Sequence, residues 1–293
     1  MSEYELDRRR VRRAFDRAAG RYDDRAVLQA EVRTRLLERL DYLRVEPANL
    51  LDLGTGTGHA LDGLRRRFSA ARVLGLDLSE CMLDRARRRG RLFSRPRVIC
   101  ADMESLPIAD QSVDLVFSSL ALQWSTRPEQ VFAEVRRVLR PGGVFSFATL
   151  GPDTLRELRD AWGDGGRVHA FFDMHDLGDA LMRVGLREVV MDVERLVLTY
   201  PTVRDVLEDL RGIGAANALQ GRSRGLLGRE SYRQMERRYE AWRDEAGTLP
   251  ATYEVVYGQA WCPAPLSPAE NEKKPLREFF VPLERIRNNK NIL

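Results

Sequence analysis

The chain has 293 residues, of which 43% are hydrophobic, so it can bury one large core in a single elaborated domain. Its formal net charge of +4 is mild, and no apolar run reaches membrane-spanning length. The first residues are too charged for a signal peptide. These features predict a cytoplasmic protein and exclude one that crosses a membrane on helices.

Cysteine and arginine usage narrows the class of protein further. Cys81, Cys100 and Cys262 lie far apart without a CxxC pair, so we expect buried thiols and neither disulfides nor a metal site. Nearly all cations are arginine, which suits an acidic partner but equally fits a skew in genomic base composition. The basic residues are dispersed without an aromatic repeat, so nucleic acid is not the expected partner.

Residues 1–45 predict a helical N-terminal part. After a basic amphipathic start, leucine and valine recur at helical spacing between Ala26 and Leu43, which indicates a helix before the first strand. The preceding stretch from Ala14 to Asp23 fits a plain helix and turn whose aromatic residues belong to the core.

Short apolar runs then alternate with helical stretches. The runs predict strands at 50–53, 72–76, 97–100, 115–118 and 144–148. Helices are expected around 59–68, 82–89 and 130–139, and a Pro141–Gly143 turn separates the last helix from its strand. This alternation predicts βαβ units, and therefore a mostly parallel α/β sheet with helices on both faces.

The second half of the chain completes this sheet. We expect a helix at 174–184, a strand at 188–200, helices at 202–211 and 230–246, and a last strand at 252–260. A helical insertion of about 201–249 therefore separates the last two of seven strands within a domain of residues 46–262. Residues 263–293 carry several prolines and all three lysines, and we expect them to form a loosely packed tail.

The predicted first strand runs directly into a glycine-rich turn. Gly54, Gly56 and Gly58 would let the backbone approach a ligand closely. This GxGxG pattern alone is a weak signal, because nucleotide sites of several classes use such turns. Asp52 sits at the end of the same strand, where its carboxylate suits an amino group better than a pyrophosphate.

The next three predicted strands also end in polar or covering residues. Asp77, followed by Leu78, stands where ribose hydroxyls need an acceptor. Asp102 could bind an adenine amino group beside the covering side chain of Met103, and Ser118 ends the fourth strand. Each acid taken alone could be an ordinary cap or turn former. Their succession in chain order instead places a ligand at the carboxyl ends of the strands.

This arrangement resembles the class I methyltransferases, which have a Rossmann-like fold and an acidic glycine loop for S-adenosylmethionine. The Leu139–Gly143 segment is similar to that family's entry into its fifth strand. The resemblance implies S-adenosylmethionine as methyl donor, and a nicotinamide dehydrogenase is the main alternative. The Ala14–Asp23 segment also resembles the mobile lid of small-molecule methyltransferases, which implies that Tyr22 closes over the cofactor.

The acceptor side offers no obvious general base. Gln123 and Trp124 follow the fourth strand and are expected to border the acceptor, whereas His169 and His175 lie further on and suit structural or capping roles. An amine, phenol or carbon acid usually needs a nearby base, but a carboxylate is already ionised at neutral pH. The lack of a base therefore weakly favours a carboxyl acceptor.

A narrower resemblance covers nearly all of Arg12 to Trp261. Six stretches resemble the malonyl-acyl-carrier-protein O-methyltransferase family of biotin synthesis, at 15–29, 120–124, 149–158, 172–179, 214–217 and 249–258. Thr55 departs slightly from the family, where cysteine or serine is common. The resemblance implies an enzyme that esterifies the free carboxylate of a malonyl thioester on acyl-carrier protein or coenzyme A. We expect this enzyme to be a monomer.

Several assignments stay open at this stage. Arginines of the insertion are candidates to meet the malonyl carboxylate or the carrier, or are ordinary surface residues: Arg211, Arg222, Arg224 and Arg229. The same cofactor pocket could serve a quinone or a free small acid. A respiratory-complex assembly factor with similar motifs and a pure carrier-binding module are the alternatives from other classes.

Overall fold

The computed structural model describes residues 7–89, 95–163, 171–214 and 229–264. The chain divides into a compact unit Met1–Pro263 and a second unit Ala264–Leu293, and the description below concerns the first. Its helices are α1 (Arg8–Ala18), α2 (Tyr22–Arg25), α3 (Val27–Arg39), α4 (His59–Arg67), α5 (Glu80–Arg88), α6 (Pro128–Val138), α7 (Arg156–Trp162), α8 (Met174–Arg183), α9 (Val203–Gly212) and α10 (Arg229–Glu240). Its strands are β1 (Asn49–Leu53), β2 (Arg72–Asp77), β3 (Arg97–Cys100), β4 (Val113–Ser119), β5 (Leu139–Leu150), β6 (Arg187–Tyr200) and β7 (Leu249–Trp261).

The seven strands form one sheet in the order β3-β2-β1-β4-β5-β7-β6. Neighbouring strands are parallel except β7, which is antiparallel to both β5 and β6. The predicted seven-stranded, mostly parallel sheet is confirmed. The strand order reverses direction between β1 and β4, the place where open α/β sheets bind ligands.

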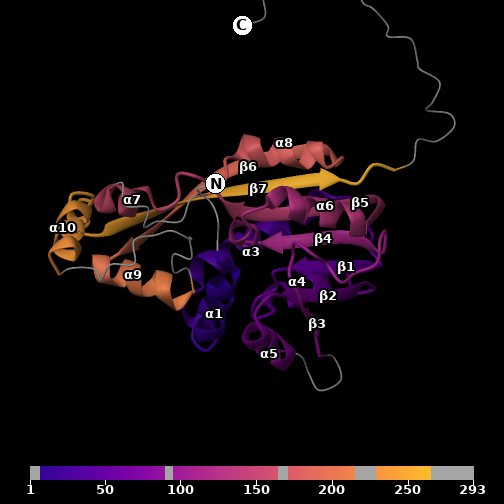
Figure 1. The fold of residues 1–293 in the computed structure, drawn as a ribbon, viewed down its shortest axis with the longest axis horizontal. Helices are drawn as coiled ribbons and strands as arrows, with labels where there is room; N and C mark the ends of the chain where they lie inside the picture. Colours follow the sequence, from indigo (N-terminus) through magenta and orange to yellow (C-terminus); the bar gives the residue numbers. More distant parts are fainter. Residues whose placement is uncertain (1–6, 90–94, 164–170, 215–228, 265–293) are drawn as a thin grey trace, which may run out of the picture. The chain divides into compact units, whose positions relative to one another are not determined.

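Helices cover both faces of this sheet because the central strands are apolar on both sides (Figure 1). Leu50 of β1 belongs to the core cluster shared with α3, α4, α7, α9 and α10. Leu51 and Leu53 point the other way, into the cluster shared with α6 and α8. Side-chain alternation along β1 therefore places Asp52 on the same face as Leu50, toward α3.

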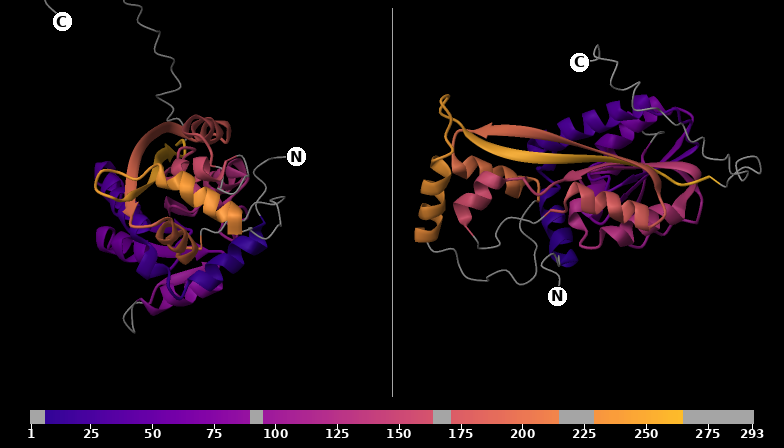
Figure 2. Two further views of the ribbon diagram at one scale, coloured as in Figure 1. Left: turned by 90° about the vertical axis from the view of Figure 1, so that its left-hand side faces the viewer. Right: turned by 90° about the horizontal axis from the view of Figure 1, so that it is seen from above.

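The strands β6 and β7 are the longest partners in the sheet and carry the insertion at one end (Figure 2). They pair continuously from Val190 opposite Gln259 to Tyr200 opposite Leu249. The helices α9 and α10 lie between them in sequence, and α10 packs against α7.

Some elements differ from those predicted. The helix expected at 230–246 ends at Glu240, because the Asp244 carboxylate accepts two hydrogen bonds from Thr248 and builds a turn. The strand β5 begins at Leu139 rather than at residue 144, with a register shift opposite β4. The helix α7 was not predicted. Cys81 and Cys100 are exposed, so the expected burial holds only for Cys262.

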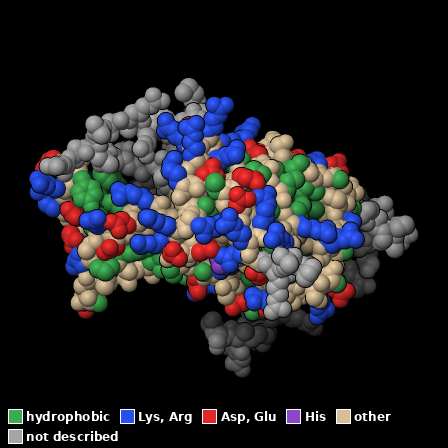
Figure 3. Space-filling model, turned by 90° about the horizontal axis from the view of Figure 1, so that it is seen from below, with side chains coloured by type: hydrophobic (Ala, Val, Ile, Leu, Met, Phe, Trp, Pro, Cys, Tyr) green, Lys and Arg blue, Asp and Glu red, His purple; other side chains and the backbone are tan. Residues whose placement is uncertain are grey.

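The helix α1 packs against α5. Arginine side chains gather across the middle of the face of the molecule that carries these two helices (Figure 3). Among the described helices, none has the length and apolar character needed to cross a bilayer.

Candidate active site

A cavity of about 770 Å³, counting its open mouth, lies at the carboxyl ends of β1, β2, β3 and β4. Volumes of a few hundred cubic ångströms are typical of small-molecule sites. The helix α1 and residue Tyr22 cover it. Its lining consists of Arg8, Val11, Phe15, Tyr22, Gly54, Gly56, Leu76, Asp77, Leu78, Met82, Ala101, Asp102, Met103, Glu104, Ser119, Leu120, Ala121, Trp124 and Ser125.

The glycine turn after β1 is held against β2 by its backbone. The amides of Gly54 and Thr55 both donate to the Leu76 carbonyl, at 2.8 and 2.9 Å. Gly54 has a positive φ of 77°, and a Cβ there would lie 2.2 Å from the Ala121 Cβ. Gly56, with φ 55°, would project a Cβ into open space. The turn therefore passes between β4 and the cavity only because these positions lack side chains.

Asp77 organises the turn as well as lining the cavity. Its carboxylate accepts hydrogen bonds from the amides of Gly56 and Ser79, both at 2.8 Å. Burial raises the pKa of Asp77, and the backbone hydrogen bonds counteract this rise. A carboxylate has about four lone-pair positions. Asp77 can therefore accept further hydrogen bonds from a bound ligand.

The loop after β3 brings two acidic residues, Asp102 and Glu104, to the cavity. Asp102 accepts the Glu104 amide at 2.9 Å and the Arg8 guanidinium at 2.7 Å. Arg8 also contacts Glu104, which is buried and accepts the Ser125 hydroxyl at 2.7 Å. The α1 arginine thus joins the N-terminal part of the chain to the loop that follows β3.

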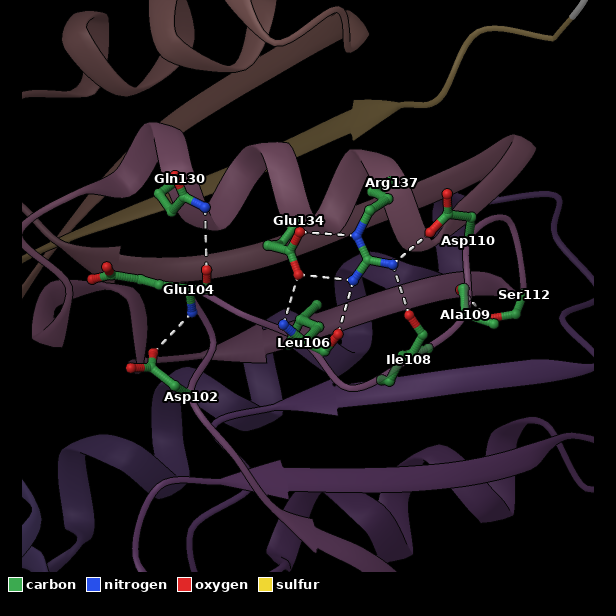
Figure 4. Close-up of polar contacts among 10 residues, drawn as sticks. All are labelled: Asp102, Glu104, Leu106, Ile108, Ala109, Asp110, Ser112, Gln130, Glu134 and Arg137. Atoms are coloured by element: carbon green, nitrogen blue, oxygen red, sulfur yellow. Dashed lines mark hydrogen bonds and ion pairs between the residues drawn. The ribbon is translucent and has the colours of Figure 1, made fainter.

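A single arginine of α6 fixes the course of that loop (Figure 4). The Arg137 guanidinium donates to the carbonyls of Leu106 and Ile108, at 2.8 and 2.7 Å. It also pairs with Glu134 and Asp110. Glu134 in turn accepts the Leu106 amide at 2.6 Å, and Arg137 lowers its pKa. These contacts hold the backbone that carries the acidic pair.

The helix α1 is tied down at several points around the cavity. Asp16 accepts the Ser79 hydroxyl at 2.6 Å. Phe15 meets the Trp124 ring edge to face, with centroids 5.1 Å apart. The next segment is held by Asp23, which accepts the Thr57 hydroxyl at 2.6 Å. In this arrangement the N-terminal part forms one wall of the cavity.

Asp52 lies behind the cavity rather than in its lining. Its carboxylate is buried and accepts the Thr55 hydroxyl at 2.5 Å. Burial raises the pKa of Asp52 to about 7, the Thr55 hydrogen bond opposes the rise, and the nearby charge of Asp77 adds to it. Arg33 of α3 interacts with this carboxylate electrostatically, and burial lowers the pKa of Arg33.

The described lining contains neither histidine nor lysine. Tyr22 has a pKa raised by burial and by the charge of Asp77, so its phenol is neutral at physiological pH. Asp173 caps α8 by accepting the backbone amide of His175, and the His175 ring contacts the same carboxylate. His169 lies outside the described residues. The described lining therefore provides hydrogen-bond acceptors and apolar cover, and its candidate bases are the carboxylates of Asp77, Asp102 and Glu104.

Comparison with known proteins connects this cavity to a chemistry. Residues 51–147 match the family described as "Methyltransferase domain". The malonyl-[acyl-carrier protein] O-methyltransferase of Laribacter hongkongensis is 54% identical, over 88% of this chain and 90% of that protein. The enzyme of the same name from Halorhodospira halophila is 52% identical, over 87% of this chain and 88% of that protein.

The chain belongs to the malonyl-[acyl-carrier protein] O-methyltransferase family. Its fold matches a Haloferax volcanii methyltransferase solved with the Trm112 activator, with a TM-score of 0.55 and 23% identity. That match covers 88% of this chain and 99% of the other. By family and fold, this protein is an O-methyltransferase that uses S-adenosylmethionine as methyl donor.

The cavity of this O-methyltransferase fits S-adenosylmethionine. Gly56 leaves open space where a side chain would otherwise project, and the carboxylates of Asp77 and Asp102 can accept more hydrogen bonds than the protein gives them. Met103 and Leu78 add apolar surface beside these acids. An adenosine group needs acceptors for its hydroxyls and amino group together with apolar cover for its ring.

The structure places half of the predicted site residues around the cavity of the O-methyltransferase. Those in its lining are Tyr22, Gly54, Gly56, Asp77, Leu78, Asp102, Met103 and Trp124. Their contact with the cofactor or the acceptor stays a prediction.

The other predicted residues have different surroundings. Gly58 begins α4, where a Cβ would lie 2.8 Å from Ala86. The Ser118 hydroxyl donates to the Leu53 carbonyl, and the neighbouring Ser119 lines the cavity instead. Gln123 is buried and donates to the Leu120 carbonyl at 2.8 Å.

The insertion arginines are not in the described lining. Arg211 is exposed on α9. Arg222 and Arg224 lie outside the described residues, and so does the side chain of Arg229.

Arg8 and Glu104 are among the lining residues that sequence reasoning missed. Arg8 stands in a run of arginines, and no sequence signal distinguishes it from its neighbours. Its position depends on how α1 docks. Glu104 could have been noticed, because it follows Asp102 by two positions at the end of β3.

Proposed function

We propose that this protein transfers the methyl group of S-adenosylmethionine to the free carboxylate of a malonyl group carried on acyl-carrier protein. The observation that carries the proposal is a covered cavity with acidic cofactor acceptors and neither histidine nor lysine in its described lining. Curated relatives at 54% and 52% identity are named for this substrate. A carboxylate acceptor is ionised at neutral pH and needs no base.

The residues of the cavity take the following roles in this proposal. Asp77 accepts the ribose hydroxyls, Asp102 accepts the adenine amino group, and Met103 covers the ring. Gly54 and Gly56 let the backbone approach the methionine end. Tyr22 and the rest of residues 1–45 act as a lid over the domain of residues 46–262.

S-Adenosylmethionine supplies a methyl group on a sulfonium, which leaves as a neutral thioether. Methyl transfer is an in-line displacement, so the protein chiefly aligns the two reactants and excludes water. Phe15, Val11 and Leu120 provide apolar walls for this purpose. The Tyr22 phenol is neutral, so it can donate a hydrogen bond to the acceptor carboxylate without repelling it.

The product of the proposed reaction is a methyl ester that hides the charged end of the malonyl group. A chain end without charge can be elongated as an ordinary acyl chain. This is the place in biotin synthesis that the family resemblance implies.

The test incubates the protein with methyl-labelled S-adenosylmethionine and either malonyl-carrier or acetyl-carrier protein. We expect base-labile label on the malonyl form alone, because only that form has a free carboxylate. Label on neither form, with S-adenosylmethionine binding intact, would refute the proposal and direct the search to quinones and free small acids. An absence of measurable cofactor binding would instead favour the assembly-factor alternative.

A further inference from the structure

The exposed side of α1 carries three arginines at four-residue intervals. Arg9, Arg13 and Arg17, called here the basic face of α1, are all exposed. A spacing of four residues keeps them on one side of a helix. Val11, Ala14 and Ala18 are buried on the opposite side. The basic face of α1 is therefore the surface that this helix presents to solvent.

The charges of this face lack acidic partners. Within the part of the chain that the structure describes, no ion pair is formed by Arg9, Arg13 or Arg17, whereas Arg10 and Arg12 of the same helix pair with Asp7 and Asp16. On the insertion, Arg204 pairs with Glu208 and Arg237 with Glu230.

The start of α1 is also a poor place for cations. Positive side chains in the first turn oppose the helix dipole, and α1 has no acidic residue in that turn. The helix dipole therefore gives no reason for an arginine at position 9. Binding of an anionic partner would give such a reason.

The helix α1 forms part of the cavity wall, and its basic face lies on the outer side of that wall. The same helix contributes Arg8, Val11 and Phe15 to the lining. The neighbouring helix α5 adds the exposed Arg85 and Arg88, and Arg85 donates to the Gly20 carbonyl just beyond α1. Arginine side chains gather in this part of the surface (Figure 3). A macromolecule docked on this surface would lie one helix diameter, roughly 10–12 Å, from the cavity.

We propose that the basic face of α1 docks the acidic surface of acyl-carrier protein while the carrier's malonyl arm enters the cavity. The inference rests on the proposed function, because that function makes an acidic protein the bearer of the substrate. Charge complementarity of this kind mainly raises the association rate and fixes the orientation of the partner. Docking at this face places the carrier beside the lid rather than on the insertion arginines that the sequence suggested.

The experiment compares two charge-reversal variants of the full chain. One is Arg9→Glu/Arg13→Glu/Arg17→Glu. The matched control is Arg66→Glu/Arg72→Glu/Arg97→Glu, which changes three exposed arginines at the opposite, amino-terminal edge of the strands by the same charge. Glutamate and arginine have similar helix propensities, so α1 should persist. If the variant binds S-adenosylmethionine with unchanged affinity, α1 has kept its place in the cavity wall.

Two acceptors separate docking from chemistry. For malonyl-carrier protein we expect the α1 variant to raise KM by about tenfold or more, with kcat nearly unchanged and a weaker dependence of kcat/KM on salt. For malonyl-N-acetylcysteamine, which has no carrier, KM should stay at the wild-type value. The control variant should resemble wild type with both acceptors. The milder Arg9→Gln/Arg13→Gln/Arg17→Gln variant should give an intermediate KM.

Other outcomes are distinguishable. A wild-type KM for malonyl-carrier protein in the α1 variant overturns the docking site, as does an equal loss with both acceptors. A selective rise in KM with Arg211→Glu, and not with the α1 variant, places the carrier on the insertion. Failure of the wild-type protein to methylate malonyl-carrier protein refutes the proposed function itself.

Discussion

Asp52 and Asp77 end neighbouring strands, yet their carboxylates have different surroundings. Asp77 accepts two backbone amides and lines the cavity. Asp52 is buried behind the glycine turn and, among the described residues, its carboxylate accepts the Thr55 hydroxyl. Desolvation is thus better compensated at Asp77 than at Asp52. Asp52 is the residue whose ionisation should be visible in the stability of the protein.

Stability should fall as Asp52 ionises. Its pKa is raised from 3.8 to about 7 in the folded protein, so between these values the folded state holds a proton that the unfolded chain has released. This contribution to stability is complete below pH 3.8 and is lost as the pH rises through 7. Asp52→Asn, which keeps an acceptor for Thr55, should gain stability relative to wild type by up to about 4 kcal/mol over this window.

Denaturant unfolding at pH 5 and pH 8 measures this difference. Asp84→Asn changes an exposed carboxylate on α5 and should leave the pH dependence of wild type unaltered. If the stability difference between Asp52→Asn and wild type is the same at both pH values, the raised pKa of Asp52 is wrong.

The glycine turn offers a second prediction. Gly54 and Gly142 have nearly equal positive φ values, 77° and 78°, so alanine is strained at both. Only at Gly54 would the new Cβ clash, 2.2 Å from the Ala121 Cβ, since nothing lies within 4 Å at Gly142. Gly54→Ala should therefore lower the free energy of unfolding by about 1–3 kcal/mol more than Gly142→Ala. Equal losses in thermal or denaturant unfolding would show that Ala121 moves aside freely.

Among the elements, α6 contributes to the site without entering it. Arg137 binds two carbonyls and two carboxylates around the loop that follows β3 (Figure 4). The loop has no regular secondary structure between Cys100 and Val113, so side-chain contacts hold it. Positioning of Asp102 therefore depends on a helix that packs on the other side of the loop.

Arg137→Met should loosen this loop while it keeps the apolar stem against α6. We expect S-adenosylmethionine binding to weaken on the order of tenfold, because several charge-assisted hydrogen bonds are lost together. Amide hydrogen exchange should accelerate in 102–110. Arg136→Met is the control on the same helix, since no ion pair of Arg136 occurs among the described residues. Unchanged exchange in 102–110 would mean that the loop is held by other contacts.

At the scale of the described unit, the paired strands β6 and β7 support the insertion. Tyr239 of α10 is fully buried and donates to the Pro250 carbonyl at 2.9 Å, at the start of β7. Gly214, just beyond α9, lies against α1, where its Cβ would meet Phe15 at 3.2 Å. The insertion, the lid helix and the cavity are thus connected by packing. A change in α1 can therefore alter the packing of both the cavity and the insertion.

Local patterns predicted most of the elements. The strands β1 to β4 and the helix α3 follow from apolar runs and helical spacing, which depend only on near neighbours in sequence. The overlong prediction for α10 shows the limit, because a turn between Asp244 and Thr248 overrides helix propensity. Gln123 was expected beside the acceptor, but the backbone after β4 turns its side chain toward the Leu120 carbonyl.

The sequence by itself determined the fold class, the cofactor type and the family, because these depend on strand-end acids and glycines that local patterns along the chain reveal. Only the tertiary structure decided which groups meet. Arg8 reaches Asp102 across 94 positions of sequence, and Arg137 reaches Leu106 across 31. Such contacts depend on how α1 and α6 dock, which is set by packing of whole apolar faces and not by any local pattern.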